Sequence, residues 1–305
     1  MPIRQITIVG TGLIGGSFGL ALKKHRFAGR IIGCDRAPVL ERARGKGAID
    51  DGDTNIADAA RGSQVVLLAT PVGAIIEAIG RLGPSLPAKT LLTDTGSTKA
   101  EVLARAAATF RKQTGNRFLA GHPMAGKEQS GVEFADADLF QGAAWLFTPS
   151  EGQDIYSGLC GEFLEWVERI GARVASMEAA EHDELCAWIS HLPQMMSTAL
   201  AAALVETYGE GAPLLEAGGR ALREMTRVSA SPYSMWRDIA LTNKTNIRSA
   251  LLKLEQHLAH IRENLDTKEL ALEFERAHQL RKALPRRHGD TEKTRPRSKT
   301  SGSQP

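Results

Sequence analysis

Glycines near the N-terminus have a spacing that is suited to binding phosphate groups. Gly10, Gly12 and Gly15 follow an apolar run, Ile6–Val9, and precede a stretch of helical pattern that continues to His25. In a strand, turn and helix of this kind, the first glycine permits a tight turn, the second lets the backbone approach a pyrophosphate, and the third allows close packing. The loop therefore predicts dinucleotide binding. The residues expected at the cofactor are Gly10, Gly12, Leu13, Ile14 and Gly15, with Thr70 and Pro71 after a later strand.

A carboxylate follows the second predicted strand, which covers residues 30–33. Asp35 stands twenty residues beyond Gly15, where it can accept hydrogen bonds from the ribose hydroxyls of an adenosine and would repel a 2′-phosphate. The neighbouring Arg36 can pair with such a phosphate, but the adjacent carboxylate opposes this. We expect NAD as the cofactor, with NADP less favoured. The alternative for Asp35 is an ordinary turn residue after a strand.

Three further loops are predicted at the same edge of the sheet, since ligands of open α/β folds lie beyond the carboxyl ends of the strands. They contain Thr70-Pro71, residues 94–97 and residues 121–126. In the last of them, His122 stands just after a predicted strand, Phe118–Ala120. A histidine can act as a base at neutral pH because its reference pKa is near 6.5. Taken alone, a single histidine is more often structural.

Ser97 is the second candidate for chemistry in these loops. Residues 98–101, Thr-Lys-Ala-Glu, have the pattern of a capping box with Thr98 as the N-cap. This capping role for Thr98 would leave the hydroxyl of Ser97 free. The alternative for Ser97 is a structural role at the start of the helix.

The elements that must position these loops alternate along the first half of the chain. Short β-type runs are separated by longer helical stretches, which predicts crossover connections and a parallel sheet. A last strand is predicted over residues 173–176, and helical patterns dominate from about Glu178 to Leu284. We therefore predict a doubly wound, Rossmann-type α/β domain over residues 1–176 and an all-α domain over residues 177–284. The predicted strands cover residues 6–9, 30–33, 65–69, 91–94, 118–120, 145–147 and 173–176.

Apolar residues recur at helical spacing in the second half, as expected of a core or a subunit interface. They include Leu251, Leu254, Leu258, Ile261 and Leu265. Pro193, Pro213 and Pro232 are predicted helix boundaries. Residues 285–305 are basic and polar without apolar periodicity, so we predict a disordered tail there.

Composition excludes several classes of function. The chain has 38 basic and 35 acidic residues, of which six basic and two acidic residues lie in the last 21 positions. Residues 1–284 therefore have 32 basic and 33 acidic residues and a net charge of −1. The predicted folded part thus has no positive excess to attract nucleic acid. No apolar run approaches the ~20 residues that span a bilayer, so no membrane association is expected. Three scattered cysteines do not suggest disulfides or a CxxC metal site. We expect a cytoplasmic protein.

Six motifs in order resemble the prephenate/arogenate dehydrogenase family, which acts in tyrosine biosynthesis. They are Gly-Thr-Gly-Leu-Ile-Gly-Gly-Ser at 10–17, Asp-Thr-Gly-Ser-Thr-Lys at 94–99, Gly-His-Pro-Met-Ala-Gly at 121–126, Ser-His-Leu-Pro at 190–193, Thr-Arg-Val-Ser at 226–229 and Trp-Arg-Asp-Ile at 236–239. The resemblance covers residues 3 to about 265. It implies the oxidative decarboxylation of a cyclohexadienyl substrate, in which the 4-hydroxyl loses its proton while hydride leaves C4 for NAD and the ring carboxylate departs as carbon dioxide. By this resemblance His122 accepts the hydroxyl proton, and Ser97 holds the same oxygen and His122 in position.

The resemblance also assigns substrate contacts in the helical half. It makes Arg227 the candidate to bind a substrate carboxylate, for which a guanidinium is suited; an ordinary surface ion pair is the alternative. It places His191 at the same pocket, although a histidine at a helix end is commonly a capping group, and it leaves Trp236 to packing. The segment 181–184, Glu-His-Asp-Glu, and the pair His257 and His260 lack a recognised ligand spacing. We expect them on solvated helix faces and predict no metal.

Two positions depart from the commonest family pattern and bear on the substrate. Gln194 stands where many prephenate users have a second histidine, and its amide can face the ammonium of arogenate as readily as a keto group. Lys127 stands where a small hydroxyl residue is frequent, and it favours prephenate if it reaches the anionic pocket. We expect an enzyme that uses arogenate, with prephenate as the other candidate substrate. Family likeness further implies a homodimer formed through the helical domain.

Two other functions compete with this interpretation. A β-hydroxyacid dehydrogenase also joins a dinucleotide domain to a helical one, but it relies on a catalytic lysine, for which Lys244 is the candidate here. A dinucleotide-sensing regulator would keep the cofactor fold without chemistry, but its DNA-binding or partner-binding module is not evident.

Overall fold

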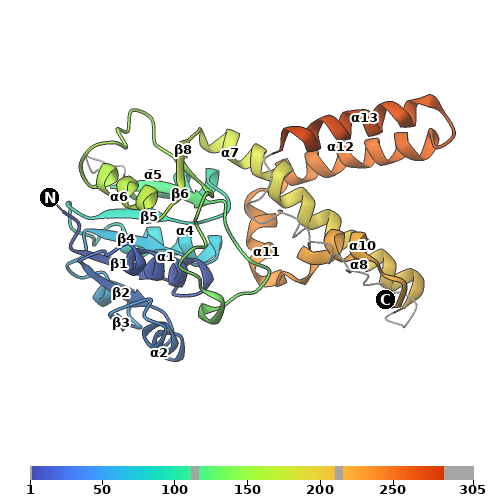
Figure 1. Ribbon diagram of the computed structural model, residues 1–305. Coiled ribbons are helices and arrows are strands. Elements are labelled where there is room, and N and C mark those ends of the chain that lie inside the picture. The colour runs from blue at the N-terminus through green and yellow to red at the C-terminus, as the bar shows by residue number, and fades with distance from the viewer. Residues whose placement is uncertain (1, 111–116, 210–215, 285–305) are drawn as a thin grey trace, which may run out of the picture. The chain divides into compact units, whose positions relative to one another are not determined.

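The computed structural model describes residues 2–110, 117–209 and 216–284 (Figure 1). Its first half is built on an eight-stranded sheet in the order β3-β2-β1-β4-β5-β6-β7-β8. All neighbouring strands are parallel except β6 and β7, which are antiparallel. The strands are β1 (Gln5–Val9), β2 (Arg30–Cys34), β3 (Asp51–Asp53), β4 (Val65–Leu68), β5 (Leu91–Asp94), β6 (Phe118–Pro123), β7 (Ala144–Thr148) and β8 (Arg173–Ser176).

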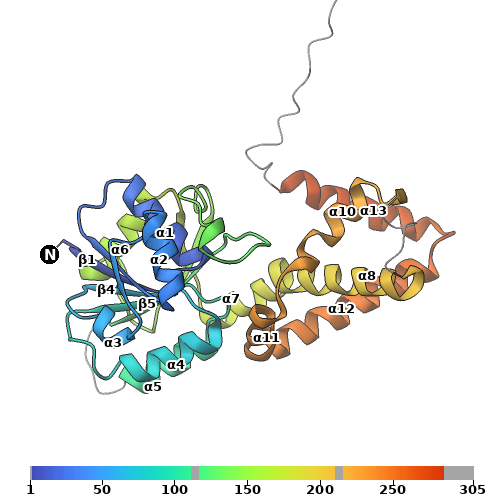
Figure 2. The same cartoon turned by 90° about the horizontal axis from the view of Figure 1, so that it is seen from below.

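Helices cover both faces of the sheet, as Figure 2 shows. One apolar cluster contains Phe18, Trp145 and Phe163, and a second contains Ile75 and Val102 on the opposite face. Burial on both faces explains the unbroken apolar sequence of β4, because each side chain of such a strand meets a helix. The prediction of a doubly wound α/β domain is confirmed. The helices are α1 (Leu13–Lys24), α2 (Ala37–Gly45), α3 (Ile56–Ala59), α4 (Val72–Leu82), α5 (Ala100–Phe110) and α6 (Gly158–Arg169), with the short helix η1 (Val132–Phe134).

Three details of the sheet differ from the sequence prediction. The sheet is mixed, because β7 returns antiparallel to β6. The short strand β3 was missed, since its sequence Asp-Gly-Asp carries no β signal. The strand β6 extends through Pro123, so His122 lies within the strand and pairs with Leu146 of β7. The prediction that His122 follows the strand was therefore wrong by a few residues.

The second half is helical, as predicted. Pro232 is the N-cap of α11, which confirms it as a helix boundary. Pro193 lies in the first turn of α8, but the backbone stays helical from α7 through η2 into α8, so it does not separate two helices. Pro213 lies outside the described residues. The elements are α7 (Ala179–Cys186), the π-helical turn η2 (Ala187–His191), α8 (Leu192–Tyr208), α10 (Arg220–Thr226), the 3₁₀ turn η3 (Arg227–Ala230), α11 (Tyr233–Thr242), α12 (Lys244–Glu263) and α13 (Lys268–Ala283).

The chain forms two compact units, Met1–Leu251 and Leu252–Pro305. The first unit holds the sheet together with the helices from α7 to the first turns of α12. The second unit holds the rest of α12 and α13, where Glu273 pairs with Arg276 at 2.8 Å. None of the helices in the described part of the chain combines the length and the apolarity that a membrane span needs. The predicted tail, residues 285–305, lies outside the described residues.

Candidate active site

The glycine loop lies at the carboxyl end of β1. At two of its glycines a side chain would collide with the backbone, and at the third there is open space. Gly10 has a φ of +90°, and a Cβ on it would lie 2.5 Å from the carbonyl oxygen of Ala69. A Cβ on Gly15 would collide with the carbonyl oxygen of Gly10. By contrast, a Cβ on Gly12 would meet nothing within 4 Å. The loop therefore leaves open space at the start of α1, which begins with Leu13 and Ile14, as phosphate binding requires.

Asp35 holds the glycine loop from the end of β2. Its Oδ2 accepts the backbone N–H of Thr11 at 2.9 Å, and its Oδ1 accepts the N–H of Arg36 at 2.8 Å. A carboxylate has about four acceptor positions, so capacity remains for a ribose hydroxyl. Arg36 is exposed at the N-cap of α2. The structure thus brings Asp35 and the glycine loop together, as predicted for a cofactor site.

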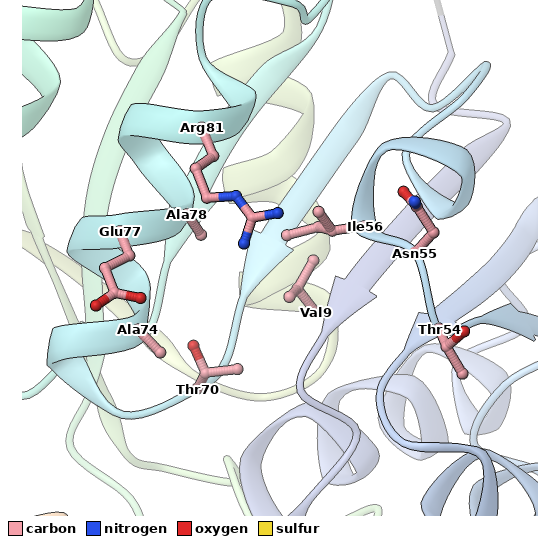
Figure 3. Close-up of a pocket in the computed structure, with 9 residues that line it drawn as sticks. All are labelled: Val9, Thr54, Asn55, Ile56, Thr70, Ala74, Glu77, Ala78 and Arg81. Atoms are coloured by element: carbon pink, nitrogen blue, oxygen red, sulfur yellow. The ribbon is translucent and has the colours of Figure 1, made fainter.

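A pocket of about 340 Å³ lies beside the glycine loop (Figure 3). Val9, Ile56 and Ala78 form apolar parts of its lining, and Arg81 directs its guanidinium group toward the side of Ile56. The hydroxyl of Thr70 is buried without a hydrogen-bond partner among the described residues. A buried polar group without a partner costs free energy. This hydroxyl is therefore suited to form a hydrogen bond with a bound ligand. The pocket is lined by Val9, Thr54, Asn55, Ile56, Thr70, Ala74, Glu77, Ala78 and Arg81.

The helix that follows Thr70 is anchored from the helical half of the chain. Pro71, which is exposed, is the N-cap of α4. Its side chain cannot accept a hydrogen bond, and the N–H of Gly73 instead donates to Oδ2 of Asp238 at 3.0 Å. The carboxylate of Asp238, which lies on α11, thus satisfies one of the free N–H groups that begin every helix. A residue of the helical half therefore anchors the start of α4, which lines the pocket through Ala74, Glu77, Ala78 and Arg81.

His122 lies buried in β6 and contacts a second histidine. Its Nδ1 is 2.9 Å from Nε2 of His182 on α7. The other ring nitrogen of His182, Nδ1, is 2.8 Å from Oδ1 of Asp183. His182 and Asp183 are both buried, at 0% and 2% exposure. The prediction that residues 181–184 lie on a solvated helix face was therefore wrong for these two residues, because α7 packs this face against the sheet.

Asp183 also caps the helix α5. Its Oδ1 accepts the N–H of Lys99 at 2.7 Å, and its Oδ2 accepts the N–H of Ala100 at 2.9 Å. The hydroxyl of Thr98 instead forms a hydrogen bond with the hydroxyl of Thr242 at 2.8 Å. The predicted capping box with Thr98 as the N-cap was therefore wrong: a carboxylate distant in the sequence takes the role.

A buried ion pair between Lys99 and Asp94 contacts the residue before His122. The ammonium of Lys99 bonds to Oδ2 of Asp94 and donates to the carbonyl oxygen of Gly121 at 2.7 Å. Asp94 also accepts the N–H groups of Gly96 at 2.8 Å and Gly121 at 3.1 Å. Burial lowers the pKa of Lys99, and the attraction of Asp94 opposes this shift. The pair joins the ends of β5 and β6 and fixes the backbone on which His122 stands.

The surroundings of His122 disfavour its charged form. Burial lowers the pKa of His122 well below the ordinary value of 6.5, and the nearby His182, Lys99 and His191 lower it further. His122 is therefore a neutral imidazole in the physiological pH range. A neutral, buried imidazole has the protonation state that a general base needs.

His191 is a second neutral histidine near this site. Burial lowers its pKa to about 4. Its Nδ1 is 3.2 Å from Nδ2 of Asn243, which also donates to the carbonyl oxygen of Asp183 at 2.7 Å, while Oδ1 of Asn243 accepts from Asn246. These contacts fix the amide, so Nδ1 of His191 is the acceptor and its Nε2 carries the hydrogen. That Nε2 is buried without a partner among the described residues, and it is suited to donate to a bound substrate.

The remaining substrate candidates are placed as follows. Arg227 begins η3, is about half exposed and pairs through Nη1 with Oε1 of Glu128. Lys127 is held by Asp136, with a distance of 3.0 Å between Nζ and Oδ2. Gln194 is buried on α8, and its amide donates to the hydroxyl of Thr198 at 3.2 Å.

Ser97 is half-buried, and its hydroxyl forms no hydrogen bond with another described residue. A bond between Ser97 and His122 is therefore not part of this structure, and the role of Ser97 stays a prediction. The ring of Trp236 packs edge-on against His191, with 5.9 Å between the centroids. Lys244, the candidate of the competing dehydrogenase class, is exposed at the start of α12.

Three donor atoms lie close enough together to suggest a metal ligand set. The Nδ1 of His122, the Nε2 of His182 and the Sγ of Cys186 are all within 4.8 Å of one another. The two nitrogens, however, are 2.9 Å apart, which is the length of a direct hydrogen bond. Burial raises the pKa of the Cys186 thiol to about 12, so the thiol keeps its proton when no metal ion is bound to it. The hydrogen bond therefore accounts for the cluster.

Sequence analysis assigned no role to Lys99, Asp94, His182, Asp183, Asn243 and Asp238, although Asp94 lay in a candidate loop and Asp238 in the motif at 236–239. Lys99 and Asp94 did stand inside a quoted motif, 94–99, and their charges at a strand end were the available signal. The only feature of His182 and Asp183 in the sequence is that a histidine stands next to an aspartate. Their roles depend on the packing of α7 and α11 against the sheet, which has no local sequence signature.

Comparison with known proteins places the chain in a family. The family models of the prephenate dehydrogenase nucleotide-binding domain and dimerization domain match residues 18–176 and 178–280. The prephenate dehydrogenase of Bacillus subtilis is 34% identical over 293 residues, which cover 92% of this chain and 76% of the relative. The cyclohexadienyl dehydrogenase of Zymomonas mobilis is 31% identical over 244 residues, covering 79% and 81%.

Solved structures agree with these matches. The prephenate dehydrogenase of Aquifex aeolicus in complex with hydroxyphenyl propionate and NAD+ superimposes with a TM-score of 0.82 at 30% identity, covering 92% of this chain and 98% of that one. The arogenate dehydrogenase of Synechocystis gives a TM-score of 0.72 at 26% identity, covering 91% and 99%. The chain therefore belongs to the prephenate dehydrogenase family of nicotinamide-dependent enzymes, which oxidatively decarboxylate cyclohexadienyl substrates.

Proposed function

We propose that this enzyme carries out the family reaction with His122 as the base and NAD as the oxidant. NAD, when bound, accepts the hydride that leaves C4 of the substrate. His122 takes the proton of the 4-hydroxyl on its Nε2, the C1–carboxylate bond breaks to release carbon dioxide, and its electron pair completes the aromatic ring. His122 then returns the proton to the oxygen on C4, which leaves a phenol and a neutral imidazole. The single observation that carries this proposal is the position of His122, which is buried at the carboxyl end of β6, at the same edge of the sheet as the glycine loop. Burial also lowers its pKa, which favours the neutral form.

Cofactor preference is proposed from Asp35. Its carboxylate stands at the end of β2 with acceptor capacity left over after its bonds to Thr11 and Arg36. It can accept from a ribose hydroxyl and would repel a 2′-phosphate. The open space over Gly12 and the unpartnered hydroxyl of Thr70 fit a bound dinucleotide. We assign Gly10, Gly12, Leu13, Ile14, Gly15, Thr70 and Pro71 to its binding.

The substrate is proposed to be arogenate in preference to prephenate. The buried Gln194 presents a neutral amide, whose oxygen can accept from the ammonium of arogenate. Lys127 is engaged by Asp136, so the one lysine that would favour prephenate already has an anionic partner. Arg227 is proposed to bind a substrate carboxylate, Ser97 the substrate hydroxyl, and His191 a substrate oxygen through its Nε2.

An assay of NADH formation by the purified enzyme tests this proposal. Prephenate and arogenate are each supplied with NAD and with NADP, and kcat/KM is measured for the four combinations. The highest value is expected for arogenate with NAD. A value for prephenate equal to or above that for arogenate overturns the substrate preference, and a higher value with NADP overturns the role of Asp35. Absence of turnover in all four combinations overturns the proposed function.

Replacement of Arg227 by leucine is expected to raise KM for the substrate by about 10-fold to 100-fold, because a charge-assisted bond to a carboxylate contributes roughly 1.5–3 kcal/mol. The KM for NAD should stay unchanged. Arg223, one turn earlier on α10 and exposed, provides the matched control, and its replacement by leucine should alter neither constant. Equal KM values in the two variants would show that Arg227 is only the surface partner of Glu128.

The activity of the free enzyme is expected to persist at acidic pH. Because the pKa of His122 is lowered below 6.5, the base stays neutral while the pH falls through the range in which an ordinary histidine gains a proton. A profile of kcat/KM against pH reports the pKa of the essential base in the free enzyme. Its acidic limb should therefore lie clearly below pH 6.5. A limb at or above that value would show that His122 is not held neutral by its surroundings.

The helical half is proposed to form a homodimer. In α13, Leu272, Phe274 and Leu280 are exposed at 51%, 71% and 64%, and large apolar side chains at this exposure mark an interaction surface. The match of residues 178–280 to a dimerization domain supports a second copy as the occupant. Sedimentation of the purified protein checks this. We also propose the functional division of the chain at residues 176 and 177, and a cytoplasmic location, which the three free cysteines support.

A further inference from the structure

The hydrogen bonds behind His122 have a defined direction that starts at Asp183. Both oxygens of this side chain accept backbone N–H groups at the start of α5, where a negative charge is favoured by the helix dipole. Asp183 is therefore an acceptor toward His182 as well. The 2.8 Å contact between Nδ1 of His182 and Oδ1 of Asp183 is made by a hydrogen on Nδ1. In a neutral His182, the opposite nitrogen, Nε2, then carries a lone pair.

The hydrogen on His182 also determines which nitrogen of His122 carries a hydrogen. Nε2 of His182 is 2.9 Å from Nδ1 of His122, so a lone pair on the first requires a hydrogen on the second. In the neutral His122, Nε2 is then the nitrogen without a hydrogen. This is the nitrogen that turns away from His182, and it is free to accept a proton. The direction of the chain thus decides which nitrogen of His122 is the base.

We propose that His182 and Asp183 are positioning residues that fix the tautomer of His122, so that its Nε2 meets the substrate hydroxyl as a lone pair. The inference rests on the proposed role of His122 as the base. When Nε2 takes the proton, the Nδ1 hydrogen of His122 strengthens its bond to His182, and the positive charge is stabilised through that ring by the carboxylate of Asp183. His122 later returns the proton from its Nε2 to the product oxygen, and the hydrogens on Nδ1 of both rings stay in place throughout.

We call the hydrogen-bonded series Asp183, His182 and His122 the relay, and several contacts fix the positions of its members. Asp183 is tied to α5 by two backbone bonds, and its own carbonyl oxygen accepts from Asn243 at 2.7 Å. The rings of His122 and His182 cross at 64° with centroids 5.1 Å apart. The other groups facing His122 are Lys99, which is paired with Asp94, and His191 and Cys186. Neither Lys99, as a cation, nor the protonated thiol of Cys186 can accept the Nδ1 hydrogen as well as a neutral imidazole does.

Two variants of His182 separate the relay from simple packing. In His182→Gln the amide oxygen can accept the Nδ1 hydrogen of His122, which keeps the tautomer. In His182→Leu nothing replaces the acceptor. We expect kcat to fall by roughly 10²-fold or more in the leucine variant, since a wrong tautomer behind a catalytic histidine costs up to about 10⁴-fold, and to recover most of the way in the glutamine variant. The KM for NAD should change little in either.

Asp183→Asn gives an independent test. Oδ1 of Asp183 accepts the N–H of Lys99 as well as the contact from His182, so the amide oxygen of asparagine keeps this place and the direction of the hydrogen bonds. The variant therefore removes the negative charge that stabilises the protonated His122. Loss of turnover with the acidic limb of kcat/KM displaced, in a protein that still binds NAD, supports the relay. If this variant fails to fold because it loses the cap of α5, the two His182 variants carry the test.

Nitrogen-15 NMR of histidine-labelled protein measures the tautomer without any turnover. The signal of His122, assigned by its loss in His122→Asn, should show the hydrogen on Nδ1 in the wild type. A hydrogen on Nε2, or a doubly protonated His182 in the resting enzyme, would overturn the inference. If the NMR result holds while the wild-type enzyme turns over no substrate, the proposed function fails and the tautomer assignment stands, so the two failures are distinguishable.

Cys186→Ala is the matched control, because its thiol lies 3.5 Å from the same Nε2 of His182 but is not part of the chain. It should leave kcat within about 3-fold of the wild type. A loss equal to that of His182→Leu would overturn the relay in favour of packing or of a metal held by His122, His182 and Cys186. Wild-type activity that falls on treatment with a chelator and returns with Zn²⁺ would do the same.

Discussion

Replacement of His122 by asparagine is expected to lower kcat by about 10²-fold to 10⁴-fold, which is the contribution typical of a positioned general base. Asparagine is shorter and cannot accept a proton at neutral pH, but it can remain in the β6 register beside Leu146. The affinity for NAD should be unchanged, because the glycine loop and Asp35 lie on other strands. Steady-state kinetics together with a fluorescence titration of the cofactor measure both quantities.

Lys244→Met is the control for this prediction. Lys244 is exposed at the start of α12, and it is the residue that a β-hydroxyacid dehydrogenase mechanism would need. Its replacement should leave kcat near the wild-type value. Near-normal turnover of His122→Asn combined with a large loss in Lys244→Met would reject the assignment of His122 and transfer the chemistry to the lysine.

Replacement of Lys99 by methionine is expected to lower the free energy of unfolding by about 3–5 kcal/mol. Lys99 and Asp94 are both completely buried and paired, and removing one partner of such a pair leaves a buried charge without compensation. Methionine has a similar length, so the packing loss is small and the electrostatic loss dominates. Urea denaturation monitored by circular dichroism gives the change as a shift of the midpoint.

The double variant Asp94→Asn/Lys99→Met tests the cause of that loss. It removes the uncompensated charge, and the asparagine oxygen can still accept from the backbone N–H of Gly96 or Gly121. Part of the lost stability should return. If Lys99→Met alone stays within about 1 kcal/mol of the wild type, or if the double variant is less stable than the single one, the ion pair is not what stabilises the ends of β5 and β6.

The parts of the fold that the sequence predicted are those with a local signal. Alternating apolar strands and helical stretches predicted the doubly wound sheet, and the spacing of Gly10, Gly12 and Gly15 predicted the tight turn between β1 and α1. Each of these patterns is decided within about twenty residues. Asp35 also obeys such a local rule, because its distance from the glycine loop follows from the length of one helix and one strand.

The rest of the site depends on contacts between residues that are far apart in the chain. Residues 98–101 had a valid capping pattern, yet Asp183 caps α5, because a buried carboxylate that meets two N–H groups is a stronger partner than a hydroxyl. In the sequence, nothing distinguished His182 except the adjacent Asp183. Its burial follows from the packing of α7 on the sheet, and only that packing brings its ring to His122.

Asp238 has a consequence for how the two halves of this polypeptide can be recombined. Its carboxylate completes the first turn of α4, and Thr242 and Asn243, just beyond it, bond to Thr98 and to the backbone of Asp183. Polar contacts from residues 238–243, at the end of α11, therefore connect the helical half to the sheet domain. A chimaera that exchanged residues 177–284 for those of a relative would need a matching carboxylate and amide at these positions. An exchange that omitted them would leave the starts of α4 and α5 without these partners.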